Sequence, residues 1–198
     1  MATNATSDRL HTPHRFSVEQ YYHMAEVGLL APDARTELIE GEICHMPPIG
    51  CPHAATVAWL YRQLFKVVGD RAWLVEQYPF RLSRYTESQP DLMVLRPRRG
   101  CYSDAHPTAR DALLVIEVSD SSWLYDREVK MPLYASYGVQ EVWLVDLRVG
   151  ELICHSAPHG GSFAQQTTTR APGMLLVPSL DVCVDLSEVF SFGDQSVS

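Results

Sequence analysis

The sequence predicts an α/β fold, with a mixed sheet core flanked by helices and with antiparallel hairpin additions. Short apolar runs typical of strands alternate with segments whose apolar residues recur at helical spacing. Residues 113–146 read as strand, helix and strand, and a right-handed parallel crossover is the default for that order. The 198 residues, 46% of them hydrophobic, fit one domain with a sizeable core. We expect this domain at 15–190, between a disordered leader at 1–14 and a flexible tail at 191–198.

Local signals in the N-terminal part predict a helix and a hairpin. Ser17 and Gln20 have the spacing of a capping box, so a helix is expected to start there and to end near Gly28. Residues 35–46 contain two short β-capable runs, which predicts a hairpin whose turn includes Glu40.

The strongest amphipathic helix is expected over residues 53–68, followed by a stop at Gly69. Its apolar positions are Val57, Leu60, Tyr61, Leu64, Phe65 and Val68. Strands are predicted at residues 73–77, 80–83, 92–95, 113–119 and 141–146. Further along we expect an antiparallel hairpin over 151–169, short pieces over 175–185 and a final helical turn over 186–190.

The helix expected between the strands at 113–119 and 141–146 contains a proline. Pro132 lacks the N–H that a helix interior needs. Either the regular helix begins near Met131, with Pro132 in its first turn, or the helix kinks there.

Composition excludes several classes of protein. A net charge of −8 argues against non-specific coating of nucleic acid. No apolar run is long enough to span a bilayer, and the N-terminus lacks a signal-peptide core. Five scattered cysteines without a Cys-x-x-Cys pair indicate reduced thiols, hence a cytoplasmic protein. An arginine cluster is equally consistent with a local basic rim or a solvated loop surface: Arg81, Arg84, Arg96, Arg98, Arg99 and Arg110.

Two acids stand at the ends of predicted strands. Asp91 opens the strand at 92–95, and Glu117 lies late in the strand at 113–119. If the strands are antiparallel neighbours, both carboxylates fall at one edge of the sheet. Alternation then puts Glu117 and Ser119 on the same face. Two carboxylates and the Val118 carbonyl would supply the hard oxygens that Mg²⁺ prefers.

Lys130 and Glu40 complete the candidate set. A crossover helix can bring Lys130 back over the strand's end, where its amine could orient or help deprotonate a water. Glu40 could add a ligand from the first hairpin. Taken singly, each residue has a plainer interpretation: Asp91 and Glu40 as turn residues, Glu117 as half of an ion pair, and Lys130 as a surface residue. The joint pattern favours a divalent metal site built for hydrolysis.

The motifs resemble those of the Uma-two family of putative restriction endonucleases, in the PD-(D/E)XK nuclease superfamily. The resemblance spans residues 35–190 and rests on these segments: Glu40-Gly41-Glu42, His53, Gln89-Pro90-Asp91, Val115-Ile116-Glu117-Val118-Ser119, and Lys130-Met131-Pro132-Leu133-Tyr134 through Gly138 to Asp146. It implies a restriction-endonuclease-like core and cleavage of DNA with Mg²⁺, or Mn²⁺.

Residue by residue, the resemblance assigns Asp91 and Glu117 as metal-binding acids and Glu40 as the acid from an earlier element. The superfamily usually has a lysine two positions after the second acid, where this chain has Ser119. Lys130 looks like that lysine relocated to the next helix. His53 matches a recurrent position, which suggests contact with a phosphate or the metal's outer shell beside a structural role at a helix start.

Three classes of function remain. The first is a Mg²⁺-dependent DNA endonuclease, for which a homodimer joined through apolar C-terminal strands is one expectation. The second is an inactive nuclease-fold module that binds nucleic acid or protein, which the acidic charge and Ser119 favour. The third, glycoside hydrolysis by paired carboxylates, leaves Lys130 and the arginines unexplained and ranks last.

Overall fold

The structure is a computed structural model that describes residues 13–31, 33–177 and 179–192. The chain divides into two compact units, Met1–Met46 with Ser83–Glu87, and Pro47–Leu82 with Ser88–Ser198. Residues 1–12 of the expected leader and 193–198 of the expected tail lie outside the described residues. The single domain over 15–190 stays a prediction.

The first unit contains a capped helix and a tight hairpin. Helix α1 (Val18–Glu26) has the predicted capping box, because Gln20 N donates to Ser17 Oγ and Ser17 N donates to the Gln20 side chain. Strands β1 (Thr36–Ile39) and β2 (Glu42–His45) pair antiparallel. Glu40 and Gly41 form the turn with φ of 50° and 85°, the positive values that a two-residue hairpin turn requires.

The second unit is built on a six-stranded sheet in the order β10-β9-β8-β7-β6-β3. Its strands are β3 (Trp73–Glu76), β6 (Leu92–Leu95), β7 (Ala112–Ser119), β8 (Glu141–Asp146), β9 (Glu151–His159) and β10 (Ser162–Thr169). Strands β7 and β8 are parallel, as predicted, and the other neighbours are antiparallel. The mixed α/β fold is thus confirmed. The chain enters the first unit at the end of β4 (Phe80–Ser83) and leaves it at the end of β5 (Thr86–Ser88). Strand β5 pairs with β1 and is the third strand of that unit.

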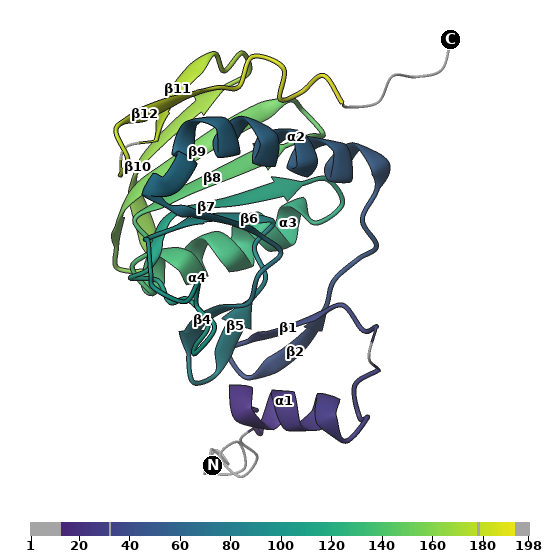
Figure 1. Ribbon diagram of the computed structural model, residues 1–198. Coiled ribbons are helices and arrows are strands. Elements are labelled where there is room, and N and C mark those ends of the chain that lie inside the picture. The colour runs from purple at the N-terminus through teal and green to yellow at the C-terminus, as the bar shows by residue number, and fades with distance from the viewer. Residues whose placement is uncertain (1–12, 32, 178, 193–198) are drawn as a thin grey trace, which may run out of the picture. The chain divides into compact units, whose positions relative to one another are not determined.

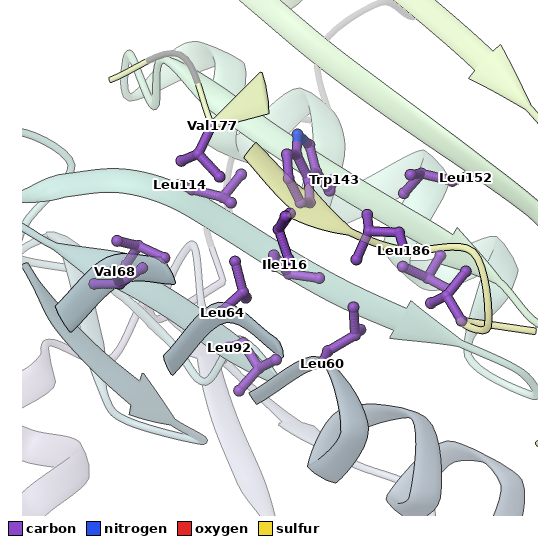
Figure 2. Close-up of a cluster of buried hydrophobic side chains, with 14 of the residues drawn as sticks. Leu60, Leu64, Val68, Leu92, Leu114, Ile116, Trp143, Leu152, Val177 and Leu186 are labelled. Carbon is purple, nitrogen blue, oxygen red and sulfur yellow. The ribbon is translucent and has the colours of Figure 1, made fainter. Parts of the chain in front are cut away.

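Helix α2 (Cys51–Val68) covers one face of this sheet (Figure 1). It starts two residues earlier than predicted, because Pro52 in its first turn loses no helical hydrogen bond. Alternation along β7 turns Leu114, Ile116 and Val118 toward α2. Figure 2 shows Leu60 and Leu64 of α2 near Ile116 in this core.

The opposite face packs on the helical segment between β7 and β8. This segment is α3 (Trp123–Tyr125), a π-helical turn (Asp126–Lys130) and α4 (Met131–Ser136). Val115 of β7 and Tyr134 of α4 belong to the same buried cluster on this side. Pro132 stands in the first turn of α4, the first of the two predicted arrangements. Without an N–H, Pro132 cannot continue the hydrogen bonding of the preceding turn, which is therefore the wider π form.

The C-terminal elements differ from prediction in two places. Strand β9 extends to His159, four residues beyond the strand expected at 151–155, because Gly160 and Gly161 make the turn with positive φ. After β11 (Met174–Val177) and β12 (Val182–Asp185), residues 187–192 form turns, so the predicted helix over 186–190 is wrong. One isolated turn has too few hydrogen bonds to nucleate a helix. Buried Leu186 and Val189 anchor the segment instead.

The 3-10 turn Gly69–Arg71 ends α2, with Gly69 at a φ of 53°, as the predicted stop required. Across the described residues, no helix is long and apolar enough to cross a membrane.

Candidate active site

The two predicted acids meet at one edge of the six-stranded sheet. Strands β6 and β7 are antiparallel with Leu92 opposite Ile116, so Asp91 lies beside the position of Glu117. Asp91 Oδ2 accepts a hydrogen bond of 2.8 Å from the Val118 backbone N–H. The strand register therefore fixes the Asp91 carboxylate against the end of β7.

His53, in the first turn of α2, contacts the same carboxylate. Its Nε2 lies 3.1 Å from Asp91 Oδ2, and both side chains are largely buried. The imidazole therefore helps to orient the acid. Its predicted contact with a phosphate or with the outer shell of a metal stays a prediction.

Lys130 reaches Glu117. The Lys130 Nζ donates a 3.1 Å hydrogen bond to Glu117 Oε1, and the two residues are only 5% and 2% exposed. The Tyr134 hydroxyl donates to the same oxygen at 2.5 Å. A buried carboxylate is costly without partners, and both of these partners come from the helical segment that follows β7.

Asp126 forms the other side of this cluster. Its Oδ2 accepts hydrogen bonds from Ser119 Oγ at 2.6 Å and Ser122 Oγ at 2.5 Å, and its Oδ1 lies 3.9 Å from Lys130 Nζ. Burial raises the pKa of Asp126, and the charge of Asp91 adds to the rise, whereas Lys130 and the two hydroxyls oppose it. Ser119 thus supports Asp126 at the position where the lysine was expected.

Helical spacing explains why these side chains converge. Asp126, Lys130 and Tyr134 are four residues apart in succession and so project from one side of the helical segment. The π-helical turn contains the first two, and both are buried. This spacing was present in the sequence and could have identified Tyr134.

The apolar neighbours of Tyr134 in the sequence predict a core residue. It is fully buried, with its ring 6.0 Å from that of Phe80, but its hydroxyl also contacts Glu117. Sequence reasoning therefore missed its polar role, and it missed Ser122 as well. Trp143, whose apolar neighbours also predict a core residue, is 1% exposed and belongs to the α2 side of the core.

Glu40 belongs to the first unit. Its carboxylate accepts a 3.1 Å hydrogen bond from Thr86 Oγ1 and lies 3.6 Å from Arg15 Nη1. These contacts hold the side chain within its own hairpin unit. Its assignment as an auxiliary acid or metal ligand stays a prediction.

Two arginines lie beside the cluster. Arg148 and Arg127 place their guanidinium carbons 4.6 Å and 5.9 Å from the ring centroid of Trp123. Arg148 also forms a two-bond ion pair with buried Asp146, which raises the pKa of the arginine. Leu147 N donates to Ser119 O, so the residue that precedes Arg148 contacts the end of β7.

A metal ion at this site would depend on the buried acidic side chains described above. Among the described residues, no three histidine, cysteine or acidic side chains are grouped to hold a metal ion by themselves. Mg²⁺, however, usually keeps several waters and takes only one or two carboxylates. The cluster contains three buried acids, Asp91, Glu117 and Asp126, and one buried lysine, Lys130. A divalent cation would offset the excess negative charge of these acids. The residues therefore fit a partly hydrated metal.

Comparison with known proteins gives a family and a shared fold. A family model described as Uma2, putative restriction endonuclease, matches residues 18–187. One similar solved structure is that of a putative nuclease belonging to DUF820 from Anabaena variabilis, with a TM-score of 0.66 and 16% identity. The match covers 89% of this chain and 98% of that chain, which shows a shared fold. No curated protein matches the chain.

Proposed function

The chain belongs to the Uma2 family, described as putative restriction endonucleases, and we propose that it hydrolyses phosphodiester bonds of DNA with Mg²⁺ or Mn²⁺. The observation that carries the proposal is the 3.1 Å contact between Lys130 Nζ and Glu117 Oε1, next to Asp91 at the same sheet edge. An acid pair beside an amine is the donor set that metal-assisted hydrolysis uses.

Asp91, Glu117 and the Val118 carbonyl would hold the metal. A bound divalent metal would polarise a phosphoryl oxygen and lower the pKa of a coordinated water. Asp91 is kept in place by the Val118 N–H and by His53, while Tyr134 and Lys130 fix the orientation of Glu117. The protein thus supplies two acids whose positions are set before substrate arrives.

Lys130 would orient the attacking water and offset negative charge that develops on the phosphoryl group. Asp126 is a positioning residue in this scheme. Ser119 and Ser122 hold its carboxylate 3.9 Å from Lys130 Nζ, so it limits where the amine can go. Exposed Arg127 and Arg148 would contact neighbouring phosphates of the DNA.

The test is cleavage of plasmid DNA by purified protein in Mg²⁺, with the variants Glu117→Gln and Lys130→Met. Each variant is expected to lose about 10²–10⁴-fold in rate, the usual contribution of a positioned acid–base group. Lys66→Met and Glu128→Gln are matched controls, because both residues are exposed. EDTA is expected to stop the reaction. Equal rates for the wild type and Glu117→Gln would refute the assignment.

The alternative is an inactive nuclease-fold module that binds nucleic acid or protein. The existing contacts of Glu117 with Lys130 and Tyr134, and the serine at position 119, favour it. This alternative predicts no uptake of Mg²⁺ or Mn²⁺ by calorimetry. Binding of either ion that is lost in Asp91→Asn would contradict it.

A cytoplasmic location and a homodimer complete the proposal. All five cysteines are free thiols, which fits a reducing compartment. Light scattering on the purified chain at several concentrations would decide the oligomeric state, and a mass of about one chain would exclude the dimer.

A further inference from the structure

A groove of about 590 Å³ opens on the second unit where α2 ends and β3 begins. Aromatic and arginine side chains line much of it, among them Tyr61, Phe65, Trp73, Arg98 and Arg99. These residues take no part in the acid cluster described above.

The aromatic wall of the groove is both exposed and ordered. Phe65 is 63% exposed and Trp73 is 41% exposed, which is unusual for such large apolar side chains. The rings of Tyr61 and Phe65 stack at 6.2 Å with an angle of 11°, and Trp73 Nε1 donates to the Arg98 carbonyl at 3.3 Å. Exposed aromatic rings that are fixed by such contacts can serve as a stacking surface for planar ligands.

The charge of the groove is opposite in sign to that of the chain. The chain has a net charge of −8, yet Arg98 and Arg99 stand in the groove against the single acid Asp70. Arg98 is held by Asp104 at 2.6 Å. Arg99 is exposed, and within the described part of the chain no hydrogen bond or ion pair engages its side chain. Its guanidinium is available for an anion such as a phosphate.

The groove and the acid cluster lie at opposite ends of the same elements. His53 is in the first turn of α2 and Phe65 is in its last turn, twelve residues later. At 1.5 Å per residue, the two are about 18 Å apart along the helix. That distance corresponds to about five steps along one strand of a DNA duplex, at 3.4 Å each. Strand β6 connects the same two regions, from Asp91 to the loop that carries Arg98.

We infer that this groove binds an unpaired segment of nucleic acid, with bases stacked on Phe65 and Trp73 and a phosphate at Arg99. Bases inside a duplex are already stacked on one another and cannot offer their faces, whereas unpaired bases can. The inference rests on the proposed nuclease function, because it specifies the substrate as DNA with a single-stranded segment near the cleaved bond. The Arg99 side chain, which is exposed and which no hydrogen bond or ion pair of the described residues engages, is what favours a phosphate-bearing ligand.

Binding can be tested apart from cleavage, by fluorescence anisotropy of a labelled twelve-nucleotide oligo(dT) in EDTA. The wild type is expected to bind this strand more tightly than a blunt duplex of the same length. Phe65→Ala is expected to weaken binding about 5-fold or more, the lower end of what one stacked base contributes. Arg99→Glu is expected to weaken it and to reduce the salt slope by about 0.7, the value for one lost contact with a single strand.

Matched controls separate the groove from general surface effects. Leu176→Ala removes an exposed apolar side chain, and Arg170→Glu reverses an exposed charge, both outside the groove. These two variants are expected to bind oligo(dT) as the wild type does. Wild-type affinity in both Phe65→Ala and Arg99→Glu would overturn the inference, and so would equal binding of strand and duplex.

The outcomes distinguish this inference from the proposed function. If the wild type cleaves nothing but binds oligo(dT) through Phe65, the groove stands and the nuclease proposal fails. If plasmid is cleaved while Phe65→Ala and Arg99→Glu bind oligo(dT) as the wild type does, the nuclease proposal stands and the groove assignment fails.

Discussion

At the scale of single residues, the acid cluster shows that a buried carboxylate depends on the residues that donate hydrogen bonds to it. Glu117 was recognisable from the sequence because a carboxylate in an apolar strand needs compensation. Its partners were harder to see, since Lys130 and Tyr134 lie 13 and 17 residues further along the chain. The four-residue spacing from Asp126 to Tyr134 was the available signal, and Pro132 within it obscured the helix.

The pKa of His155 predicts how the free energy of unfolding depends on pH. Burial lowers the pKa of His155 below 6.5, and its ring packs 5.4 Å from that of Phe163. Below pH 6.5 the unfolded chain binds a proton that the folded chain resists, so the free energy of unfolding is expected to fall as pH drops from 7 to 5. One group contributes at most about 1.4 kcal/mol per pH unit.

Urea unfolding at several pH values would measure this slope. His155→Leu is expected to flatten it, because the group that binds the extra proton on unfolding is gone. His159→Leu is the matched control, since His159 is exposed on the same strand. An unchanged slope in His155→Leu would show that other groups set the acid sensitivity.

At the scale of elements, periodicity predicted strands well and helices less fully. The predicted strands at 80–83, 92–95 and 141–146 have the observed bounds, because the last two contain short apolar runs and the first alternates apolar and polar residues. The π-helical turn was not predictable from periodicity. It depends on Pro132 in the first turn of α4, which cannot continue the hydrogen bonding of the preceding turn.

The turn between β1 and β2 gives an element-scale prediction. Gly41 has a φ of +85°, and a Cβ added there would lie 2.5 Å from Arg15 Cβ and 2.9 Å from its Cα. Gly28 has a similar φ of +76° with nothing within 4 Å of an added Cβ. Gly28→Ala is expected to cost about 1–2 kcal/mol from the left-handed backbone alone.

Gly41→Ala carries the same backbone cost and an added steric clash of about 1–3 kcal/mol. Urea unfolding of both variants compares them directly. If Gly41→Ala is no less stable than Gly28→Ala, the close approach of Arg15 to the turn is not a constraint.

At the scale of the whole molecule, the proposed metal links the site to folding. A ligand that binds only the folded state stabilises it by mass action, by about 2.7 kcal/mol at a hundred times its dissociation constant. The buried acids Asp91, Glu117 and Asp126 are expected to gain from such a cation, because their mutual repulsion is relieved. Mg²⁺ is therefore expected to raise the unfolding temperature, by about 2–4 °C per kcal/mol for a chain of this length.

Scanning fluorimetry with and without Mg²⁺ would measure this shift. Asp91→Asn is expected to lose most of it, whereas Asp104→Asn, a change at an exposed residue, is expected to keep it. An equal shift in wild type and Asp91→Asn would place the ion elsewhere on the protein.

The place of Lys130 in the chain has a consequence for variation of the proposed site. When acid and amine share a strand, their separation is set by the pleat, and an insertion between them would break the sheet. Here the amine comes from a helical segment beyond the loop at residues 120–122. Loop length and helical phase can therefore change without altering the strand that bears Glu117. The acids and the amine therefore come from separate structural elements. The number of residues between Glu117 and Lys130 is expected to vary among related sites.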